Sequence, residues 1–145
     1  MIIGITGHRK LNNIIEVENR TRDILLELKP DKLISGMAVG YDTIAVKICI
    51  ELNIPFIAAV PFLGQDVMWP MEVRREYEKL IKLAESVHYC CNPGYAAWKM
   101  QKRNEWIVDN CDILIACWDG RENGGTYNCL SYAKIKNKDI MYIKS

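Results

Sequence analysis

We predict a single α/β domain over residues 1–145, with a mostly parallel sheet of about six strands and helices on both faces. Three observations lead to this fold class. The chain has 145 residues, an ordinary length for one domain, and half of its residues are apolar. Short apolar runs alternate with longer amphipathic stretches, which is the pattern of parallel strands joined by helices. No repeat or low-complexity segment interrupts this alternation.

Six short apolar runs are the predicted strands. The runs at 55–60 and 112–118 are apolar almost throughout, as expected of strands that are covered on both faces. The full set of predicted strands is 2–6, 32–35, 55–60, 86–91, 112–118 and 139–143.

Five amphipathic stretches between these runs are the predicted helices. In the first of them, apolar residues recur at helical spacing among charged ones until Pro30 ends the pattern. Crossover connections between parallel strands are right-handed, so helices of this chain are expected on both faces of the sheet. The predicted helices are 14–29, 41–53, 71–84, 95–110 and 126–136, with loops at 61–70 and 119–125.

The composition excludes several classes of protein. Lysine and arginine number 19 against 18 acidic residues, so the chain has no surplus of positive charge for a broad nucleic-acid-binding face. No run reaches the roughly 20 apolar residues of a membrane helix, and the N-terminal apolar run is too short for a signal peptide. We expect a cytoplasmic protein with no membrane partner, and nucleic acid is a disfavoured partner.

The cysteines and histidines indicate neither a disulfide framework nor a metal site. None of the six cysteines has a partner at CxxC spacing, and most lie in apolar segments, so we interpret them as buried, reduced thiols. His8 and His88 are far apart in sequence and have no acidic or thiol neighbours at ligand spacing. We therefore expect no metal and no cofactor.

Residues that directly follow the predicted strands are the candidate ligand-binding residues, because ligands of parallel α/β sheets bind beyond the carboxyl ends of the strands. Most of these residues are glycines, small polar residues or charged residues. They are Gly7, His8 and Arg9 after the first strand, Gly36, Ala38, Gly40 and Asp42 after the second, Phe62, Gln65 and Trp69 after the third, and Trp118, Asp119, Gly124, Gly125, Thr126 and Asn128 after the fifth.

The glycine-rich segments predict an anion site. Glycine allows a close approach of the backbone to a ligand, and the start of a helix presents free N–H groups to an anion. Gly124-Gly125-Thr126 is therefore a candidate phosphate cradle, in which the Thr126 hydroxyl is a further donor. The alternative is an ordinary turn followed by a threonine that caps the helix.

Charged residues on the same edge supply candidate chemistry. Arg9 can hold a phosphate or carboxylate with two hydrogen bonds, or it can form a surface salt bridge. Asp42 can accept ribose hydroxyls, orient a water molecule or cap its helix, and Asp119 is the other candidate catalytic acid. His8 can act as a base, although a hydrogen bond that caps a loop is the more common role.

Four further candidate positions depend on the tertiary arrangement. Arg103 and Asn104 lie within a predicted helix and reach a ligand only if that helix starts near the strand ends; otherwise they form a solvated face. Trp69 and Trp118 flank strand ends and can stack on a base, although tryptophan is equally common in a small core.

Taken in order, these motifs resemble the YpsA-like branch of the SLOG superfamily. The superfamily is a Rossmann-like group that also includes the Lonely Guy phosphoribohydrolases and the DNA-processing transformation proteins. The resemblance rests on Gly7-His8-Arg9, Gly36-x-Ala38-x-Gly40-x-Asp42, Pro61-Phe62 with Gln65 and Trp69, Arg103-Asn104, and Trp118-Asp119-Gly120 with Gly124-Gly125-Thr126. It covers essentially the whole chain and implies a nucleotide or nucleotide-derived ligand, held without a cofactor, and a homo-oligomer.

One departure from the family pattern bears on activity. The enzymatic branch resembled here carries a glutamate three residues after its glycine loop, whereas this chain has Cys129 at that place and no carboxylate until Asp139. Glycosidic cleavage through an oxocarbenium-like transition state needs a positioned carboxylate, for which Asp42 and Asp119 are the substitutes available.

Three functions follow from the sequence and the resemblance. The first is binding without turnover of a nucleotide or an NAD- or ADP-ribose-derived molecule, as a sensor or as a viral or anti-defence sponge that sequesters an immune signal such as a cyclic ADP-ribose species. The second is a phosphoribohydrolase that releases a base from a nucleoside monophosphate. The third is binding of single-stranded DNA, which requires a basic groove with stacking aromatics and is disfavoured by the near-neutral charge.

Overall fold

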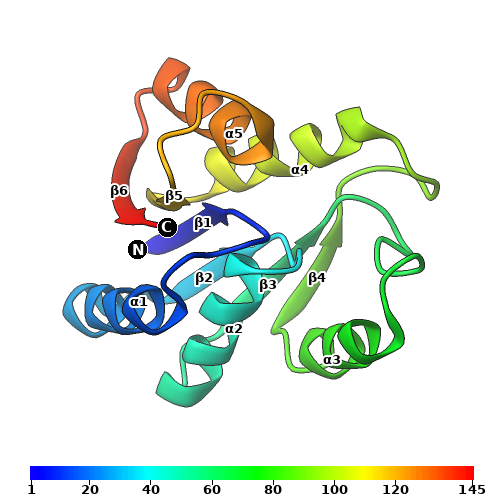
Figure 1. The fold of residues 1–145 in the computed structure, drawn as a ribbon, viewed down its shortest axis with the longest axis horizontal. Coiled ribbons are helices and arrows are strands. Elements are labelled where there is room, and N and C mark those ends of the chain that lie inside the picture. Colours follow the sequence, from blue (N-terminus) through cyan, green and yellow to red (C-terminus); the bar gives the residue numbers. More distant parts are fainter.

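The computed structural model describes residues 1–145 as one sheet covered by two layers of helices (Figure 1). All strand pairs are parallel, and the strand order is β4-β3-β2-β1-β5-β6. The predicted α/β fold with about six mostly parallel strands is therefore confirmed. The strands are β1 (Ile2–Gly7), β2 (Lys32–Ser35), β3 (Phe56–Val60), β4 (Ser86–Tyr89), β5 (Ile113–Trp118) and β6 (Asp139–Lys144).

The helices divide between the two faces of the sheet, as predicted. Figure 1 shows α1, α2 and α3 beneath the sheet and α4 and α5 above it. The contacts between helices agree, because α2 touches α1 and α3, while α4 touches α5. The helices are α1 (Ile14–Leu28), α2 (Tyr41–Leu52), α3 (Met71–Ile81), α4 (Ala97–Asn110) and α5 (Gly124–Ile135).

The sheet separates two hydrophobic cores. Adjacent residues of a strand point to opposite faces. Leu33 therefore belongs to the core between the sheet and α1–α3, and Ile34 belongs to the core between the sheet and α4 and α5. The central strands β1 and β5 are buried along four consecutive residues, whereas all four residues of the edge strand β4 are exposed. Burial on both faces accounts for the nearly continuous apolar runs in the sequence.

The strand order places a switch point between β1 and β5. These two strands are neighbours, but β1 leads into α1 on one face and β5 leads to α5 on the other. The two connections diverge, and in parallel α/β sheets the crevice between such connections is the usual ligand site.

The observed boundaries differ from the predicted ones by two or three residues at four elements. α4 begins at Ala97 instead of residue 95, and β4 ends at Tyr89 instead of residue 91. α3 ends at Ile81 instead of residue 84, and a turn follows it. α5 begins at Gly124 instead of residue 126, so the two glycines belong to the helix and contribute its first free N–H groups. The prediction placed both glycines in the loop that opens this helix, and the structure includes them in its first turn.

None of the five helices is both long enough and apolar enough to cross a membrane.

Candidate functional site

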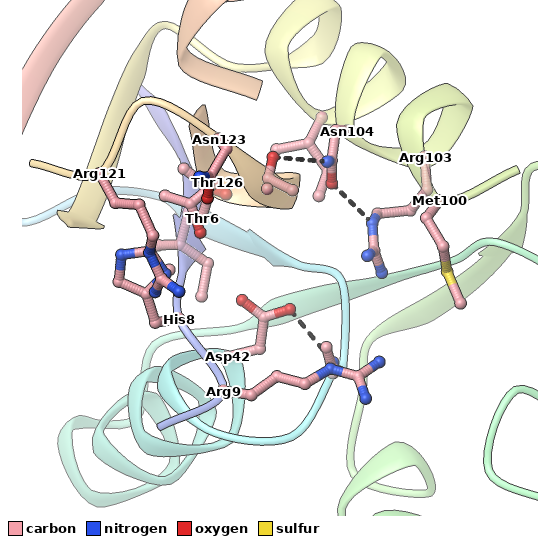
Figure 2. Close-up of a pocket in the computed structure, with 16 residues that line it drawn as sticks. Thr6, His8, Arg9, Asp42, Met100, Arg103, Asn104, Arg121, Asn123 and Thr126 are labelled. Atoms are coloured by element: carbon pink, nitrogen blue, oxygen red, sulfur yellow. Dashed lines mark hydrogen bonds between the residues drawn. The ribbon is translucent and has the colours of Figure 1, made fainter. Parts of the chain in front are cut away.

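A polar cavity of about 350 Å³ lies at the switch point between β1 and β5 (Figure 2). Four parts of the chain meet there: the segment after β1, the segment between β2 and α2, one face of α4, and the loop that leads into α5. Ten of the residues predicted from the sequence line this cavity. They are Gly7, His8, Arg9, Ala38, Asp42, Arg103, Asn104, Gly124, Gly125 and Thr126.

The segment after β1 is held against the start of α2. Tyr41 is fully buried there and donates its backbone N–H to the carbonyl of His8. Gly40 has a φ of +95°, and a Cβ at this position would lie 2.5 Å from the carbonyl oxygens of His8 and Arg9. Only glycine allows this close approach, and the approach brings Arg9 next to Asp42.

Asp42 is a buried carboxylate that lines the cavity and is only 7% exposed. Its Oδ2 accepts a hydrogen bond from the backbone N–H of Ala38, 3.1 Å away. Burial raises the pKa of Asp42 above its usual range, against the opposing effects of Arg103, the Ala38 N–H and Arg9. Asp42 does not cap α2, since that helix has no side-chain cap, so this alternative is excluded.

Arg103 and Asn104 connect the two glycine-rich segments. The guanidinium of Arg103 donates from Nη1 to the carbonyl of Gly36 at 2.7 Å and from Nε to Oδ1 of Asn104 at 2.9 Å. Asn104 in turn donates from Nδ2 to the carbonyl of Gly125 at 3.5 Å. Both side chains are therefore part of the cavity wall and not a solvated helix face.

Gly36 lies beneath this arrangement and does not line the cavity. A Cβ on Gly36 would lie 2.4 Å from Nη1 of Arg103 and 2.9 Å from Oδ2 of Asp42. The absence of a side chain at Gly36 is therefore what allows the guanidinium and the carboxylate to approach the same backbone segment.

The N-terminus of α5 is open toward the cavity. Asn123 occupies the N-cap position, and no side-chain hydrogen bond caps the helix. A Cβ added at Gly124 or Gly125 would have no atom within 4 Å, so the space in front of the first turn is free. Uncapped N–H groups and the helix dipole favour an anion at this place.

His8, Asp119 and Arg121 form a cluster at the mouth of the cavity. Nε2 of His8 lies 3.1 Å from Oδ1 of Asp119, and Arg121 lies within 3.1 Å of the Asp119 carboxylate and 3.4 Å of Nδ1 of His8. The hydrogen bond from the Arg121 N–H, followed by His8 and the Arg121 guanidinium, lowers the pKa of Asp119. Asp119 does not line the cavity; it holds two residues that do.

The lining is rich in donors and poor in acceptors. Arg9, Arg103 and Arg121 contribute three guanidinium groups, and the start of α5 adds free N–H groups. Asp42 is the single carboxylate of the lining. The electrostatics of the cavity therefore favour an anionic ligand, and guanidinium groups are well suited to phosphate.

Several predicted residues lie outside the lining because their side chains have structural partners. Phe62 packs edge-on against Tyr95, and Trp69 packs edge-on against Tyr77. Gln65 donates to the carbonyl of Gly36, and Trp118 donates to the carbonyl of Arg121. The predicted positions outside the lining are Gly36, Gly40, Phe62, Gln65, Trp69, Trp118, Asp119 and Asn128.

The lining also contains residues that the set of predicted ligand residues did not include. Met100 and Ile107 lie three residues before and four residues after Arg103, so they share its face of α4. Arg121 and Asn123 lie in the loop before α5, and Ile5 and Thr6 belong to β1. Helical spacing from Arg103 is the sequence signal that would have indicated the two apolar residues.

The family of the chain follows from a match along nearly its whole length. The family model YpsA, described as the YspA SLOG family, matches residues 5–144. The chain belongs to this family. One relative is the uncharacterized SPbeta prophage-derived protein YoqJ of Bacillus subtilis strain 168, which is 32% identical to this chain over 120 residues. The match covers 71% of this chain and 69% of YoqJ.

Solved structures with the same fold include proteins of different function. DNA processing protein A from Streptococcus pneumoniae and from Helicobacter pylori each superpose with a TM-score of 0.75, at 21% and 18% identity. They match 99% and 100% of this chain, which spans only 50% and 66% of theirs. The molybdenum cofactor binding protein from Rippkaea orientalis superposes with a TM-score of 0.65 at 18% identity. The match covers 99% of this SLOG chain and 76% of the chain of that protein.

Proposed function

We propose that this SLOG domain binds a nucleotide or nucleotide-derived small molecule in the cavity at the β1/β5 switch point and does not turn it over. The phosphate of the ligand lies at the N-terminus of α5 and is held by the arginines of the lining. The observation that carries this proposal is the open, uncapped start of α5 in a cavity that is lined by three arginines.

Two features favour binding over cleavage. The place of the family's catalytic glutamate is occupied by Cys129, whose side chain is completely buried, so α5 supplies no carboxylate to the cavity. Asp119 is engaged by His8 and Arg121 and lies outside the lining. Glycosidic hydrolysis commonly uses two carboxylates, and only Asp42 faces the ligand space.

The experiment is to denature the purified protein, identify by mass spectrometry any small molecule that it releases, and repeat this after incubation with candidate nucleotides. An intact nucleotide-derived molecule, recovered unchanged, is the expected result. Recovery of free base and ribose phosphate would contradict binding without turnover.

The finer form of the proposal is a sensor or sponge that sequesters a signal derived from NAD or ADP-ribose. Its supports are the resemblance described above and the similarity to a prophage-derived relative. Isothermal titration with cyclic ADP-ribose isomers, ADP-ribose and cyclic dinucleotides tests it. Absence of heat with all of them, in a protein that still binds a simple nucleotide, would exclude the signal and leave the binding site.

A second candidate is a phosphoribohydrolase in which Asp42 activates the attacking water. The observation in its favour is that burial raises the pKa of Asp42, as is common for groups with a role in proton transfer. Incubation of purine monophosphates with a high concentration of the protein, followed by chromatography for free base, tests this candidate. No free base would exclude it.

Binding of single-stranded DNA is a weaker alternative. Its support is the shared fold with DNA processing protein A, whose Helicobacter pylori form is described for its single-stranded DNA binding mode. Neither Trp69 nor Trp118 lines the cavity, so the aromatic side chains that would stack on bases are missing from it. The net charge of +1 also gives no surplus of positive charge for a broad basic groove. A salt-dependent mobility shift of a labelled oligonucleotide would favour this alternative.

A further inference from the structure

Asp42 has the one side chain of the cavity wall that, when ionised, can only accept hydrogen bonds. Such a carboxylate offers about four acceptor sites, and the N–H of Ala38 occupies one of them. No other hydrogen bond within the chain reaches the Asp42 carboxylate, although Asp42 is only 7% exposed. Figure 2 shows it pointing into the space between His8 and Arg103.

A ligand that satisfies this wall must present two kinds of group. It needs acceptors, best as an anion, opposite the α5 N-terminus and the guanidinium groups. It needs donors opposite Asp42, because the carboxylate has a single hydrogen bond within the chain and a buried carboxylate with few partners is costly. A free inorganic phosphate at the start of α5 satisfies the first requirement, but it is too small to present a donor to Asp42 at the same time.

The separation of the two places indicates which donors these are. Asp42 follows β2, and the start of α5 follows β5, with β1 between them. Neighbouring strands lie about 4.8 Å apart, so the carboxyl ends of β2 and β5, from which the two segments start, are about 10 Å apart. A ribose attached to the phosphate brings its hydroxyls to Asp42 across this distance, whereas the amino groups of a base extend farther.

We infer that Asp42 recognises the vicinal hydroxyls of a ribose whose 5′-phosphate lies at the N-terminus of α5, so that the site selects ribonucleotides over deoxyribonucleotides. The inference rests on the proposed nucleotide-binding function and adds a sugar specificity to it. It also separates this site from single-stranded DNA, which lacks the 2′-hydroxyl. Arg9 and Arg103 flank Asp42 and keep the carboxylate in place while the hydroxyls donate to it.

The test compares the four common ribonucleoside 5′-monophosphates with their 2′-deoxy counterparts, with inorganic phosphate as the reference ligand. Binding is measured by NMR titration of backbone amide shifts on the full chain. We expect the ribonucleotides as a set to bind at least tenfold more tightly than the deoxyribonucleotides. The Asp42→Asn variant should lose this difference, because its single acceptor oxygen is used by the Ala38 N–H. The Asp23→Asn variant, changed at an exposed residue of α1, should keep it.

The outcomes separate the inference from the proposed function. Equal binding of ribo- and deoxyribonucleotides by the wild-type protein overturns the inference without any variant, and so does a preference that survives in Asp42→Asn. Both results leave the phosphate site standing. If neither nucleotides nor inorganic phosphate shift the amides of Gly124–Thr126, the proposed function itself is wrong and the inference falls with it.

Discussion

At the scale of single residues, the site contains buried charged side chains, which lower the stability of the fold. Asp42 and Arg103 are both buried, and the buried carboxylate has fewer partners than it can accept. A fold that keeps such a group in place loses stability at that position, which is a common property of ligand sites in proteins.

Replacing Asp42 by asparagine should stabilise the fold near neutral pH. The pKa of Asp42 is raised above its usual value of 3.8, chiefly by burial, so the folded state binds the proton more tightly than the unfolded state. Stability is therefore lost as the pH rises through this folded-state pKa, and the asparagine variant avoids that loss. Thermal unfolding between pH 4 and pH 7 measures the effect. The Tm of the variant relative to wild type should increase with pH; a constant difference would contradict this account.

At the scale of elements, α4 organises the strand-end side of the molecule. One face of this helix carries Arg103 and Asn104, which connect the segment after β2 with the start of α5. Its first turn carries Lys99, which is 8% exposed and whose Nζ donates to the carbonyls of Asn92, Pro93 and Gly94 at 2.7–3.3 Å. A single helix therefore positions the cavity wall and the loop beside it.

Replacing Lys99 by methionine should destabilise the protein by about 3 kcal/mol, because three carbonyls lose a charged donor and water replaces it only in part. The matched control is Lys102→Met on the same helix, where the lysine is 62% exposed and pairs with Glu105 at 3.6 Å. An exposed pair of this kind contributes about 0–1 kcal/mol. Urea denaturation of both variants checks the prediction, and equal losses would show that Lys99 does not hold the loop.

Replacing Gly125 by valine should weaken phosphate binding at least tenfold and leave the fold intact. Gly125 has no positive φ, and a Cβ there has no neighbour within 4 Å, so a side chain enters only the space in front of α5. Its effect on stability should stay within about 0.5 kcal/mol. Calorimetric titration with inorganic phosphate checks the affinity, with Asn128→Val as a control at an exposed position of α5. Unchanged affinity would place the anion elsewhere.

At the scale of the whole molecule, most of the cysteines are buried in the two hydrophobic cores. Cys49 lies in the core beneath α1–α3, and Cys111 and Cys129 lie in the core beneath α4 and α5. All six cysteines are free thiols, and only Cys90 and Cys91, at the end of β4, are partly exposed. Burial raises the pKa of the Cys49 thiol to about 12 and that of Cys90 to about 11.

A thiol reagent such as a dithio-nitrobenzoate should therefore label at most two of the six cysteines in the native protein at pH 8. The four buried thiols should react only after unfolding, because both access and deprotonation are suppressed. Absorbance of the released thiolate in native buffer and in denaturant gives the two counts. Rapid native labelling of more than two thiols would mean that the cores open far more readily than the packing implies.

Binding of the ligand should stabilise the whole domain. At a free ligand concentration of 100 times Kd, the stabilisation is about 2.7 kcal/mol, which for a chain of this size corresponds to roughly 5–10 °C in Tm. Thermal unfolding with a saturating ribonucleotide measures it. A shift of this size with inorganic phosphate alone, and no further shift with ribonucleotides, would argue against recognition of the sugar.

The sequence by itself determined the fold class, the number of strands, the elements within a few residues and the edge of the sheet at which the polar residues gather. It could do so because these properties depend on local periodicity, on turn residues and on the rule that parallel strands end at one edge. The same reasoning indicated ten residues that line the cavity, from Gly7 to Thr126.

Only the tertiary structure decided which polar residues face the cavity. Phe62, Gln65, Trp69 and Trp118 follow strands as the others do, but their side chains pack against or hydrogen-bond to other residues of the protein instead of facing the cavity. The structure likewise decided that α4 crosses the sheet so that Arg103 meets the carbonyl of Gly36, 67 residues earlier in the chain. Contacts of that separation depend on how whole elements pack, and no local pattern of residues encodes them.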